Sequence, residues 1–203
     1  MDEKQFDLVE KSAQVFLKYG VRAVTMDDLA RELGISKKTI YKYFSDKDEL
    51  IRAIIEFKTQ SDREICSIAC AQAENAIDEM IRISEFVSEM MQDVHSSVFF
   101  DLQKYHRDAW QIMEDHKNTF VRNQIKENIE RGIREGVYRE NGDSDILSKA
   151  YVATMGALFD GYTFPSNQYK FSSVLNQIIR FQIRGLANLK GLDYLKNRFD
   201  HEK

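Results

Sequence analysis

The side chains best suited to chemistry lie close together in residues 36–44, which read SKKTIYKYF. This stretch holds three lysines, two tyrosines and no acidic residue, in a chain whose formal net charge is −4. Ammonium and hydroxyl groups at this density can bond phosphate oxygens, and long side chains can reach base edges. Local charge decides such contacts, because salt screens charges beyond ~10 Å. The stretch is a candidate for nucleic-acid binding, although a basic patch by itself is more often a solvated surface.

Other kinds of chemistry lack their sequence patterns. No H-E-x-x-H, G-x-S-x-G or glycine-rich phosphate loop is present, and none of the four histidines follows a Glu by three residues. Cys66 and Cys70 are one helical turn apart, a spacing that does not favour a disulfide within a helix. We therefore expect no catalytic residues, no metal site and no cofactor.

Composition favours an all-α, water-soluble protein. The chain has 203 residues with one proline and nine glycines, too few turn-forming residues for many short strands. No run of 18 apolar residues could span a membrane, and the acidic start MDEKQF lacks the apolar segment of a signal peptide. We expect a cytoplasmic location and no membrane partner.

Capping residues and apolar spacing predict three helices in residues 1–48. The first covers residues 5–19 and ends at Gly20. The second begins after Thr25, with Asp28 completing a capping box, and ends at Gly34. The third covers residues 37–44 after Ser36. Two short helices joined by a tight turn form a helix-turn-helix, whose second helix fits the DNA major groove.

The helical wheel separates two faces of the third helix. Ile40 and Phe44 lie on the side that packs inward, with Tyr41 and Lys37 at its margins. The opposite, outward face carries Lys38, Thr39, Lys42 and Tyr43. Ser45 is the expected N-cap of a long connecting helix over residues 46–69.

The order of these residues closely resembles the N-terminal domain of the TetR/AcrR family of bacterial transcription regulators. The shared pattern is F..YG...T...LA...G.S..T.Y.YF..K..L, and it covers about residues 5–55. The resemblance implies a helix-turn-helix DNA-binding domain (1–48) and a larger ligand-binding and dimerisation domain (49–203), with about nine helices in all. It also implies DNA contacts by Thr25, Lys37, Lys38, Thr39, Tyr41, Lys42, Tyr43 and Lys47.

Small-residue and apolar stripes on the last two long predicted helices, about residues 145–164 and 168–188, suggest a homodimer. A helix with two apolar faces is buried on two sides, either within one chain or against a second copy. The family resemblance implies a four-helix dimer interface there and a palindromic DNA site. The predicted interface residues are Ala150, Thr154, Ala157, Gly161, Val174, Ile178, Phe181 and Gly185.

Aromatic and sulfur-containing residues in the second domain could be ordinary core or the lining of an effector pocket. The resemblance implies an apolar pocket among the middle helices. The candidate lining residues are Phe86, Met90, Trp110, Met113, Tyr151, Met155 and Phe159. They suggest a small apolar or aromatic effector of unknown identity.

The sequence thus favours a ligand-responsive DNA-binding regulator, and a repressor is the expectation for this family. The alternative is a helical protein-interaction module that uses residues 37–44 on an acidic partner.

Overall fold

The chain folds entirely from helices in the part that the structure describes. The computed structural model describes residues 1–95, 97–165 and 167–200, and within them the only β-type pairing is an isolated bridge between Tyr138 and Ala187. The all-α prediction is confirmed. The elements are α1 (Glu3–Tyr19), α2 (Met26–Glu32), α3 (Lys37–Tyr41), α4 (Lys47–Gln72), α5 (Ala76–Met90), α6 (Val98–Tyr105), α7 (Arg107–His116), the π-helix η1 (Lys117–Val121), α8 (Arg122–Arg134), α9 (Ser144–Gly156), α10 (Phe171–Leu186) and α11 (Leu189–Asp200).

The described residues form ten helices when the consecutive α7, η1 and α8 are counted as one, close to the nine or so that the sequence suggested. Because α7, η1 and α8 follow one another without a gap, they form one long rod with a π-helical turn in its middle. The sequence did not predict α11, which follows α10 after a break at Ala187 and Asn188.

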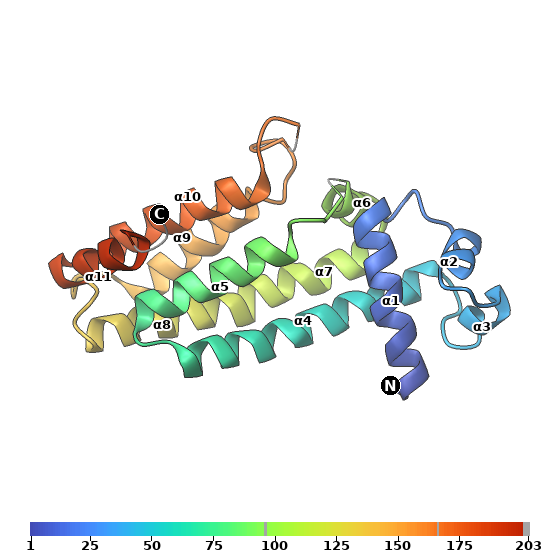
Figure 1. The fold of residues 1–203 in the computed structure, drawn as a ribbon, viewed down its shortest axis with the longest axis horizontal. Helices are drawn as coiled ribbons and strands as arrows, with labels where there is room; N and C mark the ends of the chain where they lie inside the picture. The colour runs from blue at the N-terminus through green and yellow to red at the C-terminus, as the bar shows by residue number, and fades with distance from the viewer. Residues whose placement is uncertain (96, 166, 201–203) are drawn as a thin grey trace.

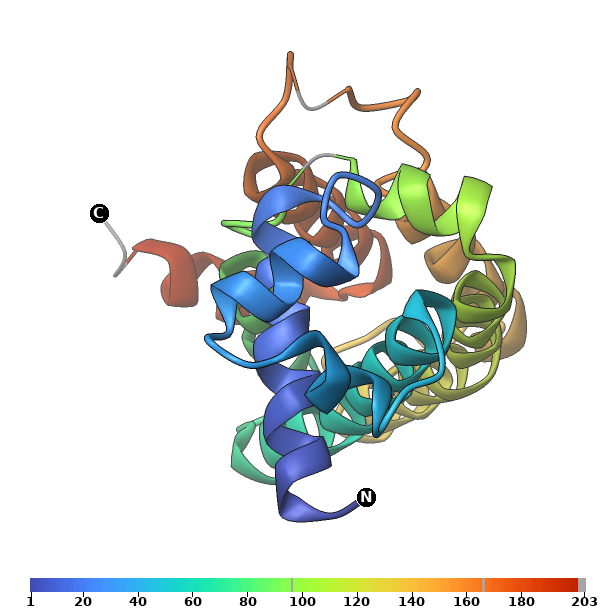
Figure 2. The ribbon, with the colours of Figure 1, turned by 90° about the vertical axis from the view of Figure 1, so that its right-hand side faces the viewer.

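The long axis of the molecule carries the N-terminal helices at one end and α11 at the other (Figure 1). Helix α4 leaves the N-terminal helices and runs along the body, where it packs against α7 and α5. Seen from the N-terminal end, α2 and α3 lie in front of the body (Figure 2). The N-terminal helices are therefore presented at the tip of an elongated helical body.

The first apolar core unites the N-terminal helices with parts of the body. Its most buried members include Val9, Leu29 and Ile40, each 0% exposed. Leu50 on α4 and Leu102 on α6 belong to the same core. The predicted boundary at residue 48 falls in the first turn of α4, so this core extends past it.

The second core lies in the body and joins α5, α8, α9 and α10. Ile77 and Ile183 are fully buried there, and Leu175 and Ile179 pack beside them. One of the two apolar stripes predicted on α10 therefore serves the chain's own core. Helices α5 and α10 pack together, as do α8 and α9.

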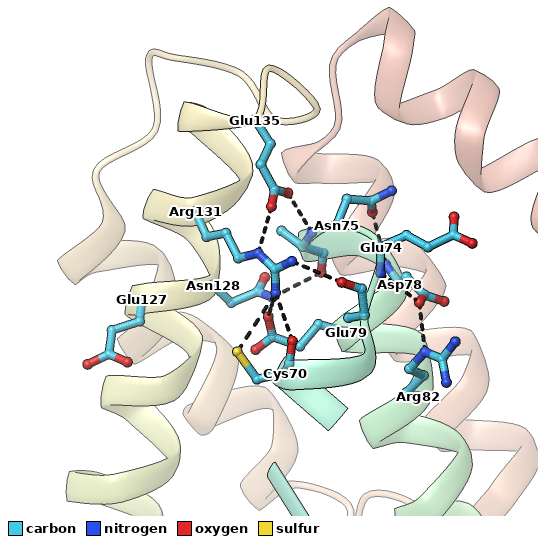
Figure 3. A network of polar contacts seen from close by, with 12 residues as sticks. Cys70, Glu74, Asn75, Asp78, Glu79, Arg82, Glu127, Asn128, Arg131 and Glu135 are labelled. Atoms are coloured by element: carbon cyan, nitrogen blue, oxygen red, sulfur yellow. Dashed lines mark hydrogen bonds and ion pairs between the residues drawn. The ribbon is translucent and has the colours of Figure 1, made fainter. Parts of the chain in front are cut away.

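A polar network centred on Arg131 closes the far end of α4 (Figure 3). The guanidinium group of Arg131 bonds Glu79 at 2.9 Å and Glu135 at 2.6 Å, and it donates to the carbonyl oxygens of Cys70 and Ala73. These carbonyls belong to the last turn of α4 and its C-cap, where helical partners are missing. Arg131 therefore fixes the end of α4 to α5 and α8.

Candidate DNA interface and effector cleft

The turn between α2 and α3 is built by two side-chain caps and a glycine. Thr25 caps α2 and forms a reciprocal capping box with Asp28, as the sequence predicts. Gly34 takes the left-handed conformation with φ of 66°, which ends α2 sharply. Ser36 then caps α3 by accepting the amide hydrogen of Thr39 at 3.1 Å.

Helix α3 is shorter than predicted, because it ends at Tyr41 rather than at Phe44. The chain continues in a turn in which the amides of Tyr43 and Phe44 both donate to the carbonyl of Ile40. Ile40 is 0% exposed and Phe44 is 2% exposed, so the predicted inward anchors are confirmed. They fix the short helix against α2 and α1 in the first core.

Six of the eight predicted DNA-contacting side chains are exposed on this surface, Lys37 and five others. Thr25, Lys38, Thr39, Tyr41 and Lys42 are all exposed. Tyr41 is 43% exposed, which places it further out than the helical wheel suggested. Together they form one face of hydroxyls and ammonium groups around α3.

Two predicted contacts, Tyr43 and Lys47, are more enclosed than expected. Tyr43 was placed on the outward arc, but its ring is partly buried and packs against the first core. The reason is the early end of α3, which changes the direction of residues 42–44. Lys42 Nζ lies 5.3 Å from the centre of the Tyr43 ring, so the tyrosine still borders the basic face.

Lys37 lies on the same face but is paired. Its Nζ lies 2.9 Å from Oδ2 of Asp27, and this hydrogen bond raises the pKa of Lys37 above its ordinary 10.5. The ion pair ties the start of α3 to the first turn of α2. Lys38 and Lys42, for which the described residues offer no acidic partner, carry the charge that is free to meet phosphates.

Lys47 points into the protein rather than away from it. Its Nζ donates to the carbonyl oxygens of Val21 and Val24, both at 2.6 Å, and lies over the Phe16 ring. Burial lowers the pKa of this lysine. Lys47 therefore fixes the loop before Thr25, and a direct phosphate contact by Lys47, which the sequence predicted, would need these bonds to break.

A large cleft lies between the C-terminal end of α5, the start of α6 and the loop that joins α9 to α10. Its volume is about 1220 Å³. Phe159, one of the predicted effector contacts, lines it together with Phe99 and Phe171. The buried apolar residues Leu158 and Val174 also line the cleft and give it an apolar base.

The other six predicted effector residues do not line this cleft. Trp110 and Met113 pack against the first core, since α7 lies against α4 there. Tyr151 belongs to the second core, and burial raises its pKa. Met155 packs at the edge of that core, and Phe86 and Met90 on α5 are only partly buried outside the cleft lining. Their types fit either role, and the structure uses most of them for packing.

The predicted dimer residues divide into four groups. Ala150 and Thr154 on α9 and Phe181 and Gly185 on α10 are exposed in the single chain, while Ile178 and Ala157 are partly buried. Val174 is 8% exposed within the second core. Gly161 lies outside any helix, because α9 ends at Gly156 rather than near residue 164, and its φ is 73°. The free apolar stripe thus covers fewer residues than predicted.

Sequence analysis missed the segment that joins the cleft to the N-terminal helices. The amide of His95 donates to the carbonyl of Leu17 at 2.7 Å, and His95 also lines the cleft. Six residues later, Asp101 accepts the amide hydrogen of Arg22 at 3.0 Å. His106, after α6, bonds Asp48 on α4.

These contacts join residues 58 to 83 positions apart, so no local sequence pattern predicts them. Arg22 completes the set: its guanidinium donates to the Tyr105 hydroxyl at 2.8 Å and lies 4.7 Å from the centre of that ring. Asp101 is 5% exposed. The only sequence signal of these contacts is Asp101, an acidic residue in the otherwise apolar first turn of α6.

Comparison with protein families gives one match, over residues 8–54, to bacterial regulatory proteins of the tetR family. The matched range contains α2, α3 and the exposed basic face. A curated relative, the uncharacterised HTH-type transcriptional regulator YvaF of Bacillus subtilis (strain 168), is 24% identical over 166 residues, covering 80% of this chain and 85% of YvaF. The HTH-type transcriptional repressor KstR2 of Mycobacterium tuberculosis (strain ATCC 25618 / H37Rv) is 22% identical over 158 residues, covering 72% of this chain and 75% of KstR2.

Solved structures share the whole fold at low sequence identity. The ketosteroid transcriptional regulator KstR2 of Mycobacterium tuberculosis superposes with a TM-score of 0.62 at 18% identity, over 93% of this chain and 97% of that one. The regulator FadR of Bacillus subtilis, solved in complex with stearoyl-CoA, gives a TM-score of 0.69 at 15% identity, over 91% and 100%. The similarity therefore extends from the N-terminal helices through the body.

Proposed function

Because this chain is a transcriptional regulator of the TetR family, we propose that it is a repressor that leaves its operator when a small molecule occupies the cleft. Its DNA-binding function is favoured over the protein-interaction alternative, since the matched family and the named relatives are DNA-binding regulators. The same relatives support the absence of an enzymatic activity. A regulator of transcription acts where the genome lies, so we place the protein in the cytoplasm.

The surface that we propose contacts DNA is the exposed face of α3 and its neighbours. Lys38, Lys42 and Thr25 supply cations and a hydroxyl for phosphates, and Thr39 and Tyr41 can reach base edges or backbone oxygens. Lys47 and Lys37 hold the loop and the helix in place through their internal bonds. A single helix-turn-helix makes few contacts, which favours a homodimer on a palindromic operator.

The exposed residues of α9 and α10 support that dimer. Phe181 is 77% exposed, an unusual position for a phenylalanine in a monomer. Gly185 one turn later leaves room for close approach, and Ala150 and Thr154 provide a small-residue surface on α9. A two-fold dimer through these helices would place two copies of α3 for two half-sites.

The observation that carries the switch is the position of His95 and of residues 97–106. His95, Ser97 and Phe99 line the cleft, while the same segment bonds Leu17, Arg22 and Asp48 of the N-terminal helices. A ligand that moves this segment therefore acts on the loop before Thr25 and on the first turn of α4. The other end of α4 is fixed by Arg131 (Figure 3), so the expected motion is a pivot of α4 about that end.

The experiment begins with selection of bound duplexes from a random pool and a search for cleft ligands by thermal shift. DNA affinity is then measured with and without a bound ligand. A coupling of roughly 1–3 kcal/mol would reduce the affinity about 5- to 150-fold. Unchanged DNA affinity at saturating ligand would show that the cleft does not control the DNA interface.

A further inference from the structure

Three phenylalanine rings that line the cleft contact one another in turn, Phe99 with Phe159 and Phe159 with Phe171. The centres of Phe99 and Phe159 are 4.6 Å apart, and those of Phe159 and Phe171 are 5.5 Å apart. Phe99 lies in α6, Phe159 in the turn after α9 and Phe171 at the start of α10, so three separate segments contribute rings to the lining of one space. At about 1220 Å³ this space accommodates a molecule of several rings or a long aliphatic body.

The charged side chains around these rings are mostly acidic. Glu85 and Glu89 come from α5, Asp93 follows it, and Asp160 lies in the loop after α9. Among the described residues that line the cleft, Lys170 is the only lysine or arginine. Four carboxylates against one ammonium group give the cleft a net negative charge, and a cleft lined by one sign of charge concentrates ligands of the opposite sign.

Several of these carboxylates are available to a ligand. Glu89 and Asp93 are exposed, and the described residues give neither of them a cationic partner. Glu85 lies 3.7 Å from Arg198, and half of its side chain remains exposed. Asp160 accepts hydrogen bonds from the Thr163 hydroxyl and from the amides of Thr163 and Tyr162, which lower its pKa and keep it ionised.

We propose that the effector of this cleft is an organic cation with an aromatic or aliphatic body, an inference that rests on the proposed function of the cleft as the effector site. The ring faces attract a cation through their negative electrostatic surface, and the rim carboxylates add a longer-range attraction. The same groups repel a polyanion. The ligand therefore differs in charge from the stearoyl-CoA bound in the FadR structure, which shares the fold but only 15% of its sequence.

A pair of probes that differ in charge alone tests the inference. Tetraphenylphosphonium and tetraphenylborate have nearly the same shape and opposite charge, and their binding to the full-length protein can be measured by isothermal titration calorimetry. The cation should bind at least tenfold more tightly at low salt. The ratio should fall as salt is raised, because the rim carboxylates are partly screened.

Neutral variants locate the effect in the cleft. Glu89→Gln and Asp93→Asn should each weaken the cation roughly two- to fivefold, as expected for an exposed charge pair, and leave the anion unchanged or bound more tightly. Glu140→Gln removes an exposed acid outside the cleft lining and should change neither. Both target residues are exposed, so the fold should survive the substitutions, and the comparison of probes on the unaltered protein needs no variant.

The outcomes separate this inference from the proposed switch. If the cation fails to bind, or the anion binds as tightly, the inference about charge is wrong, while another cleft ligand can still release the operator. If the cation binds with the expected preference but DNA affinity does not change, the charge of the cleft is established and the switch is wrong for this ligand.

Discussion

The backbone amide of Arg22 donates a 3.0 Å hydrogen bond to Oδ2 of Asp101, a residue 79 positions further along the chain. The bond joins the loop before α2 to the first turn of α6. Since Ser97 both donates to Asp101 at 3.0 Å and lines the cleft, the cleft and the DNA-binding helices share one hydrogen-bonded contact.

Replacement of Asp101 tests this contact. Asp101→Ala leaves the Arg22 amide without its partner, and we expect the free energy of unfolding to fall by about 1–3 kcal/mol. At temperatures where the variant is folded, a cleft ligand should change its DNA affinity less than it changes that of the unaltered protein. Fluorescence anisotropy on operator DNA measures both affinities. Asp108→Ala, at an exposed position on α7, is the matched control; an equal loss of ligand response there would contradict the assignment.

Lys38 in α3 and Lys42 at its C-cap, which have no acidic partner among the described residues, should account for much of the salt dependence of DNA binding. Lys38→Ala and Lys42→Ala should each weaken binding to duplex DNA and reduce the slope of log affinity against log salt by about one unit. Lys37→Ala should reduce the slope less, because Lys37 is paired with Asp27. Lys196→Ala on α11 is exposed and serves as the control. Unaltered slopes would favour an acidic protein partner.

Lys47 provides a test of two roles for one lysine. Lys47→Met removes both hydrogen bonds to the Val21 and Val24 carbonyls and should destabilise the protein by about 1–3 kcal/mol. DNA affinity should fall because the loop before Thr25 loses its support, but the salt slope should stay the same. A slope reduced by about one unit would instead show that Lys47 leaves these carbonyls and contacts a phosphate.

The capping box of α2 predicts a pH dependence of stability. The hydroxyl and amide of Thr25 donate to Asp28, which holds the pKa of Asp28 below its ordinary 3.8. A carboxyl with a lowered folded-state pKa contributes stability that is complete above its unfolded-state pKa and is lost as pH falls through the folded-state value. Urea denaturation should therefore show Asp28→Asn less stable than the unaltered protein at pH 7, with the difference shrinking as pH falls below about 4.

The control for this effect is Asp193→Asn, an exposed position on α11. Its stability difference from the unaltered protein should show no comparable loss on acidification. A constant difference for Asp28→Asn across the same range would mean that the charge of Asp28 does not strengthen the cap.

The exposed stripe on α10 predicts an oligomeric state. Phe181→Glu places a charge in the proposed interface and should shift the protein from dimer to monomer in light scattering after gel filtration. Operator affinity should fall with it, since one α3 then binds one half-site. Ile68→Glu changes an equally apolar residue that is 56% exposed on α4 and should leave the dimer intact. A dimer that survives Phe181→Glu would place the interface elsewhere.

Local chemistry explains which elements could be predicted from the sequence. Thr25 and Ser36 cap their helices as expected, and Gly20 ends α1, because each of these depends on neighbours within four residues. The predicted N-cap Ser45 was wrong by one position: Asp46 caps α4, while Ser45 bonds Glu49. Both residues favour caps, and the sequence does not show which one takes the extended conformation.

Long-range packing explains what could not be predicted. The apolar periodicity of α9 continues past Gly156, so the pattern suggested a helix to residue 164. The chain turns after Gly156 instead, and Phe159 and Phe164 line the cleft. Trp110 fits a ligand pocket by type, but α7 brings it against the first core. The position of one rod relative to another decides both cases, and no spacing within either segment encodes it.

The shared first core has a consequence for protein engineering. Val98, Leu102 and Ala109 complete the apolar interior of the N-terminal helices, although they lie beyond α5 in the chain. A fragment cut after residue 48 would lack these residues and the first half of α4, and it should not fold on its own. Chimeras that exchange the N-terminal helices of this regulator must therefore also include the matching surface of α6 and α7. Substitution of single side chains is thus the simpler route to a new operator specificity.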